Sequence, residues 1–394
     1  MPNLKELQPH IDSAFRRCVE IRRDIHRNPE LSEREHRTAK LVFDEMQSLG
    51  LPPKMHLDGT AVTALIENGK GKRVVLRADM DALPIHEETQ VPYASCVPGV
   101  MHACGHDMHT AILAGAAKVL ADVKEQWHGS VMLMFQPSEE AEPGGAVALV
   151  KDKVFPGGAD AVFGLHVNPE HPTGTIGLRE GFDFASILGF DAVVKGKGGH
   201  GGTPEQTIDP VVCAASMIME LQTLVSRECP PFEPAVLSIG TVHAGSIRNV
   251  IPSEARFSGT IRTHSIHRME HLSKRFTDVL RATADAFRAQ VDIHFEKTYP
   301  PVYNDPPVTQ RTRNALVTLL GPDNVINRQF PTMYAEDFAY YQEIIPGLFI
   351  HLGVQPPGKR LITGLHTSTF LPDENAIKTG ILAHTVFVLE MLGS

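Results

Sequence analysis

The sequence predicts an α/β protein in which a mixed sheet lies between helices and a smaller α+β domain is inserted. Short apolar β-rich runs alternate with helical segments over residues 1–183 and again over 299–394. That alternation is typical of a sheet covered by helices. Residues 184–298 instead follow the order β-α-β-β-α-β, which is the ferredoxin-like order. A chain of 394 residues also exceeds one ordinary core.

The first segment opens with two amphipathic helices, predicted over 4–27 and 33–49. The turn "NPEL" separates them, and Gly50 ends the second one. Alternating or apolar runs then predict strands, and a helical pattern over 107–123 lies between them. The predicted strands are 61–67, 72–79, a run of about seven residues from 129, and 159–167.

Strands and helices are predicted in the same way for the inserted domain and the last segment. A glycine-rich loop, "KGGHGGTPEQTIDP", follows the first strand of the inserted domain. Its predicted elements are strands at 187–196, 235–245, 254–264 and 290–299, and helices at 210–227 and 267–289. The last segment is predicted to contain helices over 308–320, 335–345 and 373–392, and a strand over 347–353.

Composition and charge exclude several classes of protein. The net charge of −9, without a Lys/Arg-rich run, argues against nucleic-acid binding. The first residues are charged and helical rather than signal-peptide-like, and no stretch approaches the roughly 18 apolar residues of a membrane span. The cysteines are odd in number and scattered, which favours a reducing cytoplasm over a disulfide framework. They are Cys18, Cys96, Cys104, Cys213 and Cys229.

Five polar motifs fall at strand ends or in loops of the larger domain. In α/β sheets ligands bind beyond the carboxyl ends of the strands, so these motifs are expected to form one site. They are "RADMDALPIH" at 77–86, "HACGHDMH" at 102–109, "QPSEEAEPGG" at 136–145, "GLHVNP" at 164–169 and "GLHTSTF" at 364–370.

Each motif also has an ordinary structural interpretation. Cys104 and His106 could be a buried thiol and a helix-capping histidine, and His166 or His366 a satisfied core histidine. Together, however, one Cys, three His and one or two Glu match a zinc or manganese site. They are too many for one closed tetrahedral site, whereas two metals about 3.5–4 Å apart with a bridging ligand would use them all. A spare glutamate could then act as general base.

Eight motifs in this order resemble the amidohydrolase branch of the aminoacylase/carboxypeptidase G metallopeptidases. That branch includes hippurate hydrolase, N-acyl-amino-acid amidohydrolases and the auxin-conjugate hydrolases of plants. The resemblance covers nearly the whole chain. It implies a dinuclear-metal catalytic domain over 1–183 and 299–394, with an inserted ferredoxin-like lid or dimerisation domain over 184–298. The motifs are "RADMDALP", "GVMHACGHDMHTAILAGAA", "FQPSEEAEPGGA", "GLHV", "GKGGHGGTP", "NVIPSEARFSGTIRT", "EDFAYYQEIIPG" and "LHTSTFLPDE".

The resemblance also implies a ligand set. Cys104 would bridge the two metals, where related peptidases use Asp. His106 and His166 would hold one metal, and Glu140 and His366 the other. Cys104 is then a thiolate ligand rather than a nucleophile, because a thiolate between two dications is deprotonated.

Glu139, beside the ligand Glu140, would be the general base that takes a proton from the attacking water. Asp81 follows a strand and could cap a helix or orient a ligand histidine, and Asp107 lies beside the ligands. Both are expected to support the ligands from outside the site. We also expect Glu336 and Asp337 to cap a helix.

Three residues of the inserted domain complete the predicted site. In the family, the loop that carries His200 reaches over the active site, often that of the partner subunit, and the histidine stabilises the oxyanion. Relatives often read "GHAAxPH" where this chain reads "GHGGTPE". Asn249 and Arg262 would contact the substrate, with Arg262 binding its carboxylate, although Arg262 could equally form an ion pair on the sheet face.

These residues predict metal-dependent hydrolysis of the amide of an N-acyl or N-aroyl amino acid by a cytoplasmic homodimer or higher homo-oligomer. Two divalent ions per subunit are expected, zinc or manganese before nickel or cobalt. The alternatives are a dipeptidase or carboxypeptidase on the same centre, a non-catalytic binding protein of the same fold, and a cysteine hydrolase. The cysteine hydrolase would work without metal and be inactivated by iodoacetamide.

Overall fold

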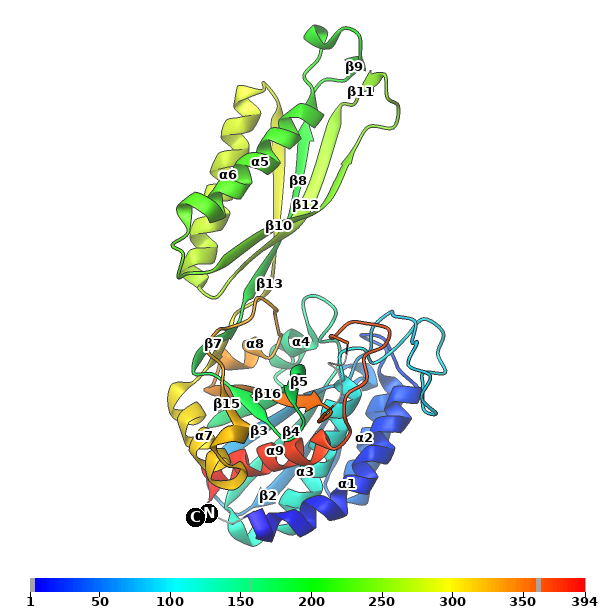
Figure 1. Cartoon of the computed structure of the whole chain (residues 1–394), viewed down its shortest axis with the longest axis vertical. Helices are drawn as coiled ribbons and strands as arrows, with labels where there is room; N and C mark the ends of the chain where they lie inside the picture. Colours follow the sequence, from blue (N-terminus) through cyan, green and yellow to red (C-terminus); the bar gives the residue numbers. More distant parts are fainter. Residues whose placement is uncertain (1–3, 157, 359–362, 394) are drawn as a thin grey trace. The chain divides into compact units, whose positions relative to one another are not determined.

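The computed structural model describes residues 4–156, 158–358 and 363–393, and the chain divides into two units (Figure 1). Unit 1 consists of Met1–Gly181, Tyr303–Phe330 and Asp337–Ser394. Unit 2 consists of Phe182–Val302 and Pro331–Glu336. Each unit has a hydrophobic core of its own.

Unit 1 is built on a mixed sheet that has eight strands among the described residues. The strand pairs β3–β4, β3–β5, β5–β16 and β6–β15 are parallel, and the other neighbouring pairs are antiparallel. In spatial order the strands are β1 (Pro53–His56), β2 (Ala61–Asn68), β4 (Gly129–Gln136), β3 (Arg73–Asp79), β5 (Ala161–Pro172), β16 (Gly347–Gln355), β6 (Ile176–Leu178) and β15 (Val325–Asn327).

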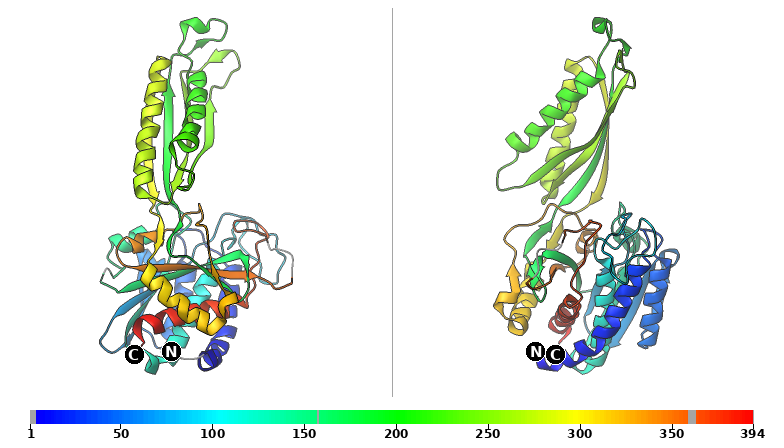
Figure 2. Two further views of the ribbon diagram at one scale, coloured as in Figure 1. Left: turned by 60° about the vertical axis from the view of Figure 1, so that its left-hand side comes forward. Right: turned by 45° about the vertical axis from the view of Figure 1, so that its right-hand side comes forward.

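Three long helices of unit 1 pack on one another: α1 (Leu4–Arg27), α3 (His106–Asp122) and α9 (Ala376–Leu392) (Figure 2). Of these, α3 and α9 contact the sheet directly. Most residues of α3 and α9 are buried, as expected of helices that are apolar nearly all round. The remaining helices are α2 (His36–Ser48), α4 (Gly145–Lys151), α7 (Pro306–Leu320) and α8 (Ala339–Gln342), with the 3₁₀ turns η1 (Leu57–Gly59), η2 (Lys124–Gln126) and η4 (Pro322–Asn324).

Two predicted helices differ from the structure. Helix α2 begins at His36 rather than at residue 33, because Glu33 has φ +66°, which a right-handed helix does not allow. The helix predicted over 335–345 is reduced to α8. The segment before it is extended instead: Thr332 N donates to Asp183 O, and Tyr334 O accepts from Ala185 N.

Unit 2 contains the elements β8 (Ser186–Lys195), α5 (Pro210–Glu228), β10 (Ala235–Ala244), β12 (Glu254–Thr263), α6 (Ile266–Ala286) and β13 (Gln290–Tyr299). Its antiparallel sheet has the order β10-β12-β8-β13, and α5 and α6 cover one face of it (Figure 2). The predicted ferredoxin-like order is therefore confirmed. Short strands form two further pairs, β9 (Gly199–His200) with β11 (Val250–Ile251) and β7 (Gly181–Phe184) with β14 (Val302–Asn304), and η3 spans Pro204–Gln206.

No helix in the described part of the chain combines the length and the apolar character needed to cross a membrane.

Candidate metal centre

Side chains from the five polar motifs lie close together in unit 1, near the ends of strands and the start of α3. Cys104 and His106 flank Gly105, the residue before the first turn of α3. Gly105 has φ +87°, and a Cβ at this position would lie 2.6 Å from Cγ2 of Val167 on β5. Glycine is therefore needed at this position for two reasons: it tolerates the positive φ, and it has no Cβ to overlap with Val167. The tight turn aims the side chains on both sides of it toward β5.

Cys104 belongs to two groups of side chains that could each hold an ion. The ligand atoms of Cys104, His106 and His166 lie within 4.8 Å of one another, and so do those of Cys104, Glu140 and His366. The Sγ of Cys104 is 3.3 Å from Nε2 of His166 and 3.2 Å from Nε2 of His366. Nε2 of His366 is also 3.2 Å from Oε1 of Glu140. The thiol thus lies at the junction of the two groups.

The donor atoms are suited to divalent metal ions. His106 Nε2 is buried and has no hydrogen-bond partner among the described residues. Glu140 Oε1 is buried as well and lies 3.2 Å from Nε2 of His366. A buried ring nitrogen is ordinarily hydrogen-bonded, so Nε2 of His106 indicates where an ion would bind. A set of one thiol, imidazoles and carboxylates matches zinc, with manganese, nickel and cobalt also possible by ligand type. The residues present therefore fit the two-metal group that the sequence implies.

The electrostatics of the cluster lead to the same conclusion. Burial, followed by the carboxylates of Glu140 and Glu139, raises the pKa of the Cys104 thiol well above its usual value. Burial alone would lower the pKa of His106, but Asp79, Asp81 and Glu140 outweigh it and raise that pKa to about 10. The site thus carries an excess of negative charge, which bound dications would neutralise and so allow Cys104 to ionise.

Asp79 and Asp81 each contact a ring nitrogen of a histidine on α3. Asp81 Oδ1 is 3.1 Å from His106 Nδ1, which leaves Nε2 of that ring facing the cluster. Asp79 Oδ1 is 2.6 Å from His109 Nδ1, and Nε2 of His109 accepts from Val167 N. Both nitrogens of His109 are therefore engaged by protein groups. This arrangement is the support that metal-binding histidines commonly receive from carboxylates.

Asp107 faces away from the ligands. Its Oδ2 accepts from Arg22 Nε and lies 2.9 Å from His26 Nδ1, and Nε2 of His26 lies 3.1 Å from Glu87 Oε1. These contacts tie the first turn of α3 to α1. His102, two residues before Cys104, is also buried, and neither of its ring nitrogens has a hydrogen-bond partner among the described residues. Burial lowers the pKa of His102 to about 4.

A buried ion-pair network that the sequence analysis did not anticipate lies at the ends of β3 and β4. Arg77 donates to Asp79 Oδ2 and Asp337 Oδ1 at 2.7 Å each, and to Gln136 Oε1 at 2.8 Å. Asp337 Oδ2 accepts from Ala146 N at the start of α4, so this residue helps to cap α4 rather than a helix of its own segment. An Arg two positions before the Asp at a strand end was the available signal, because a buried arginine requires carboxylate partners.

The glutamates follow β4 through a strained turn. Glu139 is 7% exposed, and its carboxylate belongs to a group with His106 and Glu140. Ser138, just before them, has φ +57°. Its backbone N–H donates to Oε1 of the buried Glu35 at 2.8 Å. Glu35 was not among the predicted site residues, although the sequence "NPELSERE" places it in the first loop of the chain.

His200, Asn249 and Arg262 lie in unit 2. His200 on β9 is exposed, and its Nδ1 accepts from Gly202 N at 3.0 Å. Asn249 is close to it, because Asn249 O accepts from Gly201 N and the next residue, Val250, pairs with His200. Arg262 on β12 donates from Nη1 to Met333 O at 2.9 Å.

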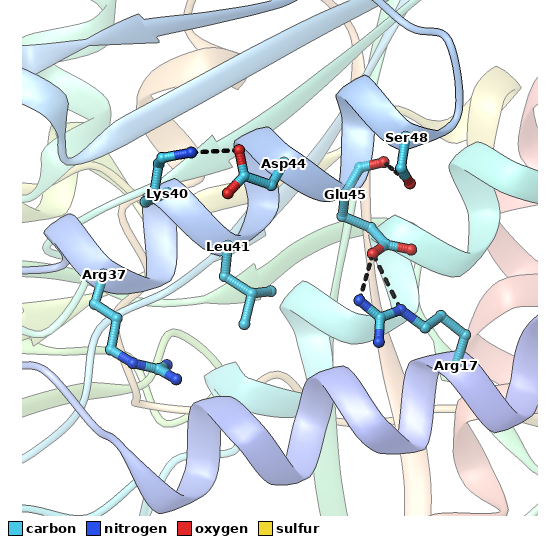
Figure 3. A pocket seen from close by; sticks show the side chains of 7 residues that line it. All are labelled: Arg17, Arg37, Lys40, Leu41, Asp44, Glu45 and Ser48. Carbon is cyan, nitrogen blue, oxygen red and sulfur yellow. Dashed lines mark hydrogen bonds and ion pairs between the residues drawn. The ribbon is translucent and has the colours of Figure 1, made fainter.

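A surface pocket between α1 and α2 contains none of the predicted site residues (Figure 3). Most of its charged side chains are already paired: Arg17 with Glu45, Lys40 with Asp44, and Arg37 with Asp24. We assign it no role. Its lining residues are Arg17, Arg37, Lys40, Leu41, Asp44, Glu45 and Ser48.

A family model and several known proteins match this chain over most of its length. The model of "Peptidase family M20/M25/M40" matches residues 75–390. The chain is 39% identical over 384 residues to an IAA-amino acid hydrolase, ILR1-like 4, of Arabidopsis thaliana, covering 95% of this chain and 87% of that protein. It is 38% identical over 373 residues to N-acetylcysteine deacetylase of Bacillus subtilis, covering 93% and 94%.

A further relative and a solved structure are also similar to this chain. Thermostable carboxypeptidase 2 of Saccharolobus solfataricus is 37% identical over 380 residues, covering 94% of both chains. Among solved structures, the YXEP protein of Bacillus subtilis, described as a dinuclear metal binding peptidase of the M20 family, superposes with a TM-score of 0.85. It is 33% identical, and the match covers 97% of this chain and 99% of that one.

Proposed function

The chain belongs to the peptidase family M20/M25/M40, in its amidohydrolase branch, and from this premise we propose that it hydrolyses the amide bond of N-acyl or N-aroyl amino acids. That it is a metal-dependent amidohydrolase or peptidase follows from the family. The observation that carries the proposal is the position of Cys104 at the junction of two ligand groups, with Glu139 beside them.

In the proposed site, His106 and His166 would hold one divalent ion and Glu140 and His366 the other, with Cys104 available to both. The two groups around Cys104 support this division. Such ions, when bound, would supply Lewis acidity to the site. Zinc or manganese suits the donors before nickel or cobalt.

Glu139 is the proposed general base. It accepts a proton from the attacking water and delivers it to the leaving nitrogen, so that a carboxylic acid and a free amino acid are released. Its burial, with 7% exposure, and its place beside Glu140 and His106 support this role. The same carboxylate can act first as base and then as acid, because its proton stays in a site shielded from bulk water.

The proposal also includes three residues of unit 2. We assign oxyanion stabilisation to His200 and substrate contacts to Asn249 and Arg262, whose guanidinium can bind a carboxylate with two hydrogen bonds. His200 and Asn249 lie together on the β9–β11 pair, which supports a joint role. We further propose a homodimer or higher homo-oligomer in the cytoplasm. The exposed edge strand β10, with Val242 55% exposed, is available for such an association.

A carboxypeptidase acting through the same centre is the second candidate, because a relative of that name is 37% identical over 94% of this chain. Both candidates cleave an amide next to an amino acid that carries a free carboxylate. They differ in the acyl side, which is a simple acyl group in one case and a peptide in the other. A substrate panel of N-benzoylglycine, N-acetylmethionine, a long-chain N-acyl amino acid and a dipeptide separates them.

The proposed function is tested with wild type and Glu139→Gln, assayed on this panel after metal analysis. We expect about two metal ions per chain in both proteins, by analogy with two-metal sites. We expect loss of kcat by about 100-fold or more in Glu139→Gln, as for a missing general base. The exposed Glu67 on β2 provides the control Glu67→Gln, which removes a carboxylate elsewhere and should keep full activity.

The outcomes separate the alternatives. Cleavage of an N-acyl substrate that EDTA abolishes and a divalent ion restores supports the amidohydrolase. Turnover that survives both EDTA and Glu139→Gln but is lost with iodoacetamide would favour the cysteine hydrolase, with Cys104 as its candidate nucleophile. Metal binding with no turnover on any member of the panel would favour a non-catalytic binding protein.

A further inference from the structure

The loop between α1 and α2 is bound to the turn that carries the two glutamates of the candidate metal centre. Two residues without the freedom of glycine adopt left-handed backbone conformations there, Glu33 with φ +66° and Ser138 with φ +57°. Glu33 N donates to Ser138 Oγ at 2.7 Å. Such conformations are unfavourable and persist only where the surroundings enforce them. The two strained residues are therefore held against each other.

Glu35 is at the centre of this contact. Its side chain is fully buried, and although the residue stands at the N-cap position of α2, it makes no capping hydrogen bond to that helix. Its Oε1 instead accepts from Ser138 N at 2.8 Å and from Glu33 N at 3.2 Å. The carboxyl group thus binds the backbone of both strained residues at once.

The backbone around Glu139 is fixed on both sides as a result. Ser138 is held at its N–H by Glu35, and its carbonyl accepts from Gly145 N at 2.8 Å. Glu140 N donates to Asp81 Oδ2 at 2.9 Å, and that oxygen also accepts from Ser32 Oγ at 2.7 Å. Residues 32–35 therefore contact the turn at Ser138 directly and at Glu140 through Asp81.

We propose that Glu35 is a positioning residue for the general base: by holding the left-handed turn at Ser138 it sets where the carboxylate of Glu139 lies. This inference rests on the proposed function, since it takes Glu139 as the base. Glu35 touches neither substrate nor metal ligand in this role. A carboxylate that acts on water must be placed to well within an ångström, so a loosened turn lowers turnover without removing the base.

To hold the turn, residue 35 must offer an oxygen that accepts the hydrogen bonds from Ser138 N and Glu33 N, and this oxygen can belong to a neutral group. Oε2 of Glu35 is buried and has no hydrogen-bond partner among the described residues. Burial, together with the nearby Asp81, raises the pKa of Glu35 to about 8, so the group is largely protonated at neutral pH. Glutamine offers the same acceptor oxygen in the same shape. Leucine keeps the volume but offers no acceptor.

The test compares Glu35→Leu with Glu35→Gln in the metal-loaded full-length protein. We expect Glu35→Leu to lower kcat by about 10- to 100-fold with KM nearly unchanged, as for a misplaced catalytic group. Glu35→Gln should stay close to wild type, and metal content should be equal in all three proteins. The control is Arg34→Ala, an exposed neighbour whose side chain makes no hydrogen bond or ion pair in the described structure.

One further readout does not depend on activity, and two further kcat measurements test the coupling between Glu35, Ser138 and Glu139. Hydrogen exchange of the peptide 136–145 should speed up in Glu35→Leu and not in Arg34→Ala, because the Ser138 amide loses its acceptor. In a Glu139→Gln background, Glu35→Leu should cause no further loss of kcat, since the group that it positions is already gone. Ser138→Ala removes the hydroxyl that accepts from Glu33 N and donates to Glu35 Oε1 at 3.4 Å, and it should lower kcat in the same KM-neutral way.

The outcomes distinguish a failure of this inference from a failure of the proposed function. If Glu35→Leu keeps wild-type kcat while Glu139→Gln loses it, the inference fails and the proposed function stands. If Glu139→Gln is fully active, the proposed function fails. A loss in Glu35→Leu that comes with lost metal, or that Glu35→Gln shares, would overturn the positioning role. Should Glu35→Leu not fold, unchanged kcat in Ser138→Ala would overturn it as well.

Discussion

His384 on α9 shows how a single buried residue can control the response to pH. Its side chain is fully buried against Phe163, with the ring centroids 4.9 Å apart. Neither ring nitrogen has a hydrogen-bond partner among the described residues. Burial, and to a smaller extent His109, lowers the pKa of His384 to about 3. The folded protein therefore keeps this ring neutral in mildly acidic solution.

We predict that His384 makes unit 1 acid-sensitive between about pH 6 and pH 3. The pKa is lower in the folded than in the unfolded chain, so over this window the unfolded chain binds an extra proton. Stability is then present above the unfolded value and lost as the pH falls, by up to about 1.4 kcal/mol per pH unit. His384→Leu should make this dependence less steep, with a remainder that comes from other buried groups such as His102, as measured by urea unfolding at pH 7, 6 and 5.

The exposed His128 supplies the control for this measurement. His128→Leu removes a histidine without removing a buried one, and its stability should follow the wild-type curve with pH. Equal pH dependence in His384→Leu and wild type would contradict the prediction, and would mean that other groups control the acid transition.

At the residue scale the sequence predicted the candidate ligands and Asp81 as a support for one of them, but not Glu35 or Arg77. Cys104, His106, Glu140, His166 and His366 stand in short polar motifs that chemistry alone makes conspicuous. Glu35 and Arg77 do not, because a glutamate in a loop and an arginine on a strand are ordinary in a sequence. Their burial, and with it their importance, appears only when distant segments pack on them.

At the scale of elements, the start of α3 depends on a glycine. Gly105 combines φ +87° with a Cβ position 2.6 Å from Val167 Cγ2. Elsewhere in unit 1, Gly174 has a similar φ of +93°, but a Cβ there would meet nothing within 4 Å. The two glycines thus separate backbone strain from steric overlap.

We predict that Gly105→Ala is more harmful than Gly174→Ala. Each should lose about 1–2 kcal/mol through left-handed strain. Only Gly105→Ala must also displace Val167, and with it the turn between Cys104 and His106. Thermal unfolding and metal content measured side by side test this. Equal losses of stability with full metal content in both variants would show that the turn tolerates the displacement.

Element boundaries were predicted where local signals acted alone and missed where tertiary contacts competed. The β-α-β-β-α-β block of unit 2 was placed correctly, because its hydrophobic periodicities are clear. The helix expected over 335–345 was shortened to Ala339–Gln342, since Thr332 and Tyr334 pair with the backbone near Asp183 and Ala185. The helix expected from residue 33 starts later, because Glu33 takes a left-handed conformation.

At the scale of the whole molecule, the two units have separate hydrophobic cores, and the predicted metal ligands lie in unit 1. Unit 1 buries His106 Nε2 without a hydrogen-bond partner among the described residues. A bound dication would satisfy this atom, so metal binding should stabilise that unit in particular.

We therefore predict that chelation lowers the unfolding temperature of unit 1 and leaves that of unit 2 unchanged. Ligand binding well above Kd contributes about 3 kcal/mol, so a shift of about 5–10 °C is expected for a unit of this size. Scanning calorimetry with and without EDTA measures it, and added zinc should reverse it. Cys104→Ala serves as the control, because its unfolding should no longer respond to EDTA.

A chelator-induced shift of equal size in wild type and Cys104→Ala would place the stabilising metal elsewhere. No shift in either protein would mean that the centre is filled weakly or not at all under those conditions.

The sequence by itself determined the fold class, the ferredoxin-like order of unit 2, and the set of candidate ligands, because periodicity and residue chemistry are local properties. Tertiary structure alone decided that Cys104 is shared between two groups, that Pro331–Glu336 packs with unit 2, and that Glu35 holds the turn at Ser138. These last facts join residues up to hundreds of positions apart. Burial and backbone strain at such contacts arise only once the chain has folded.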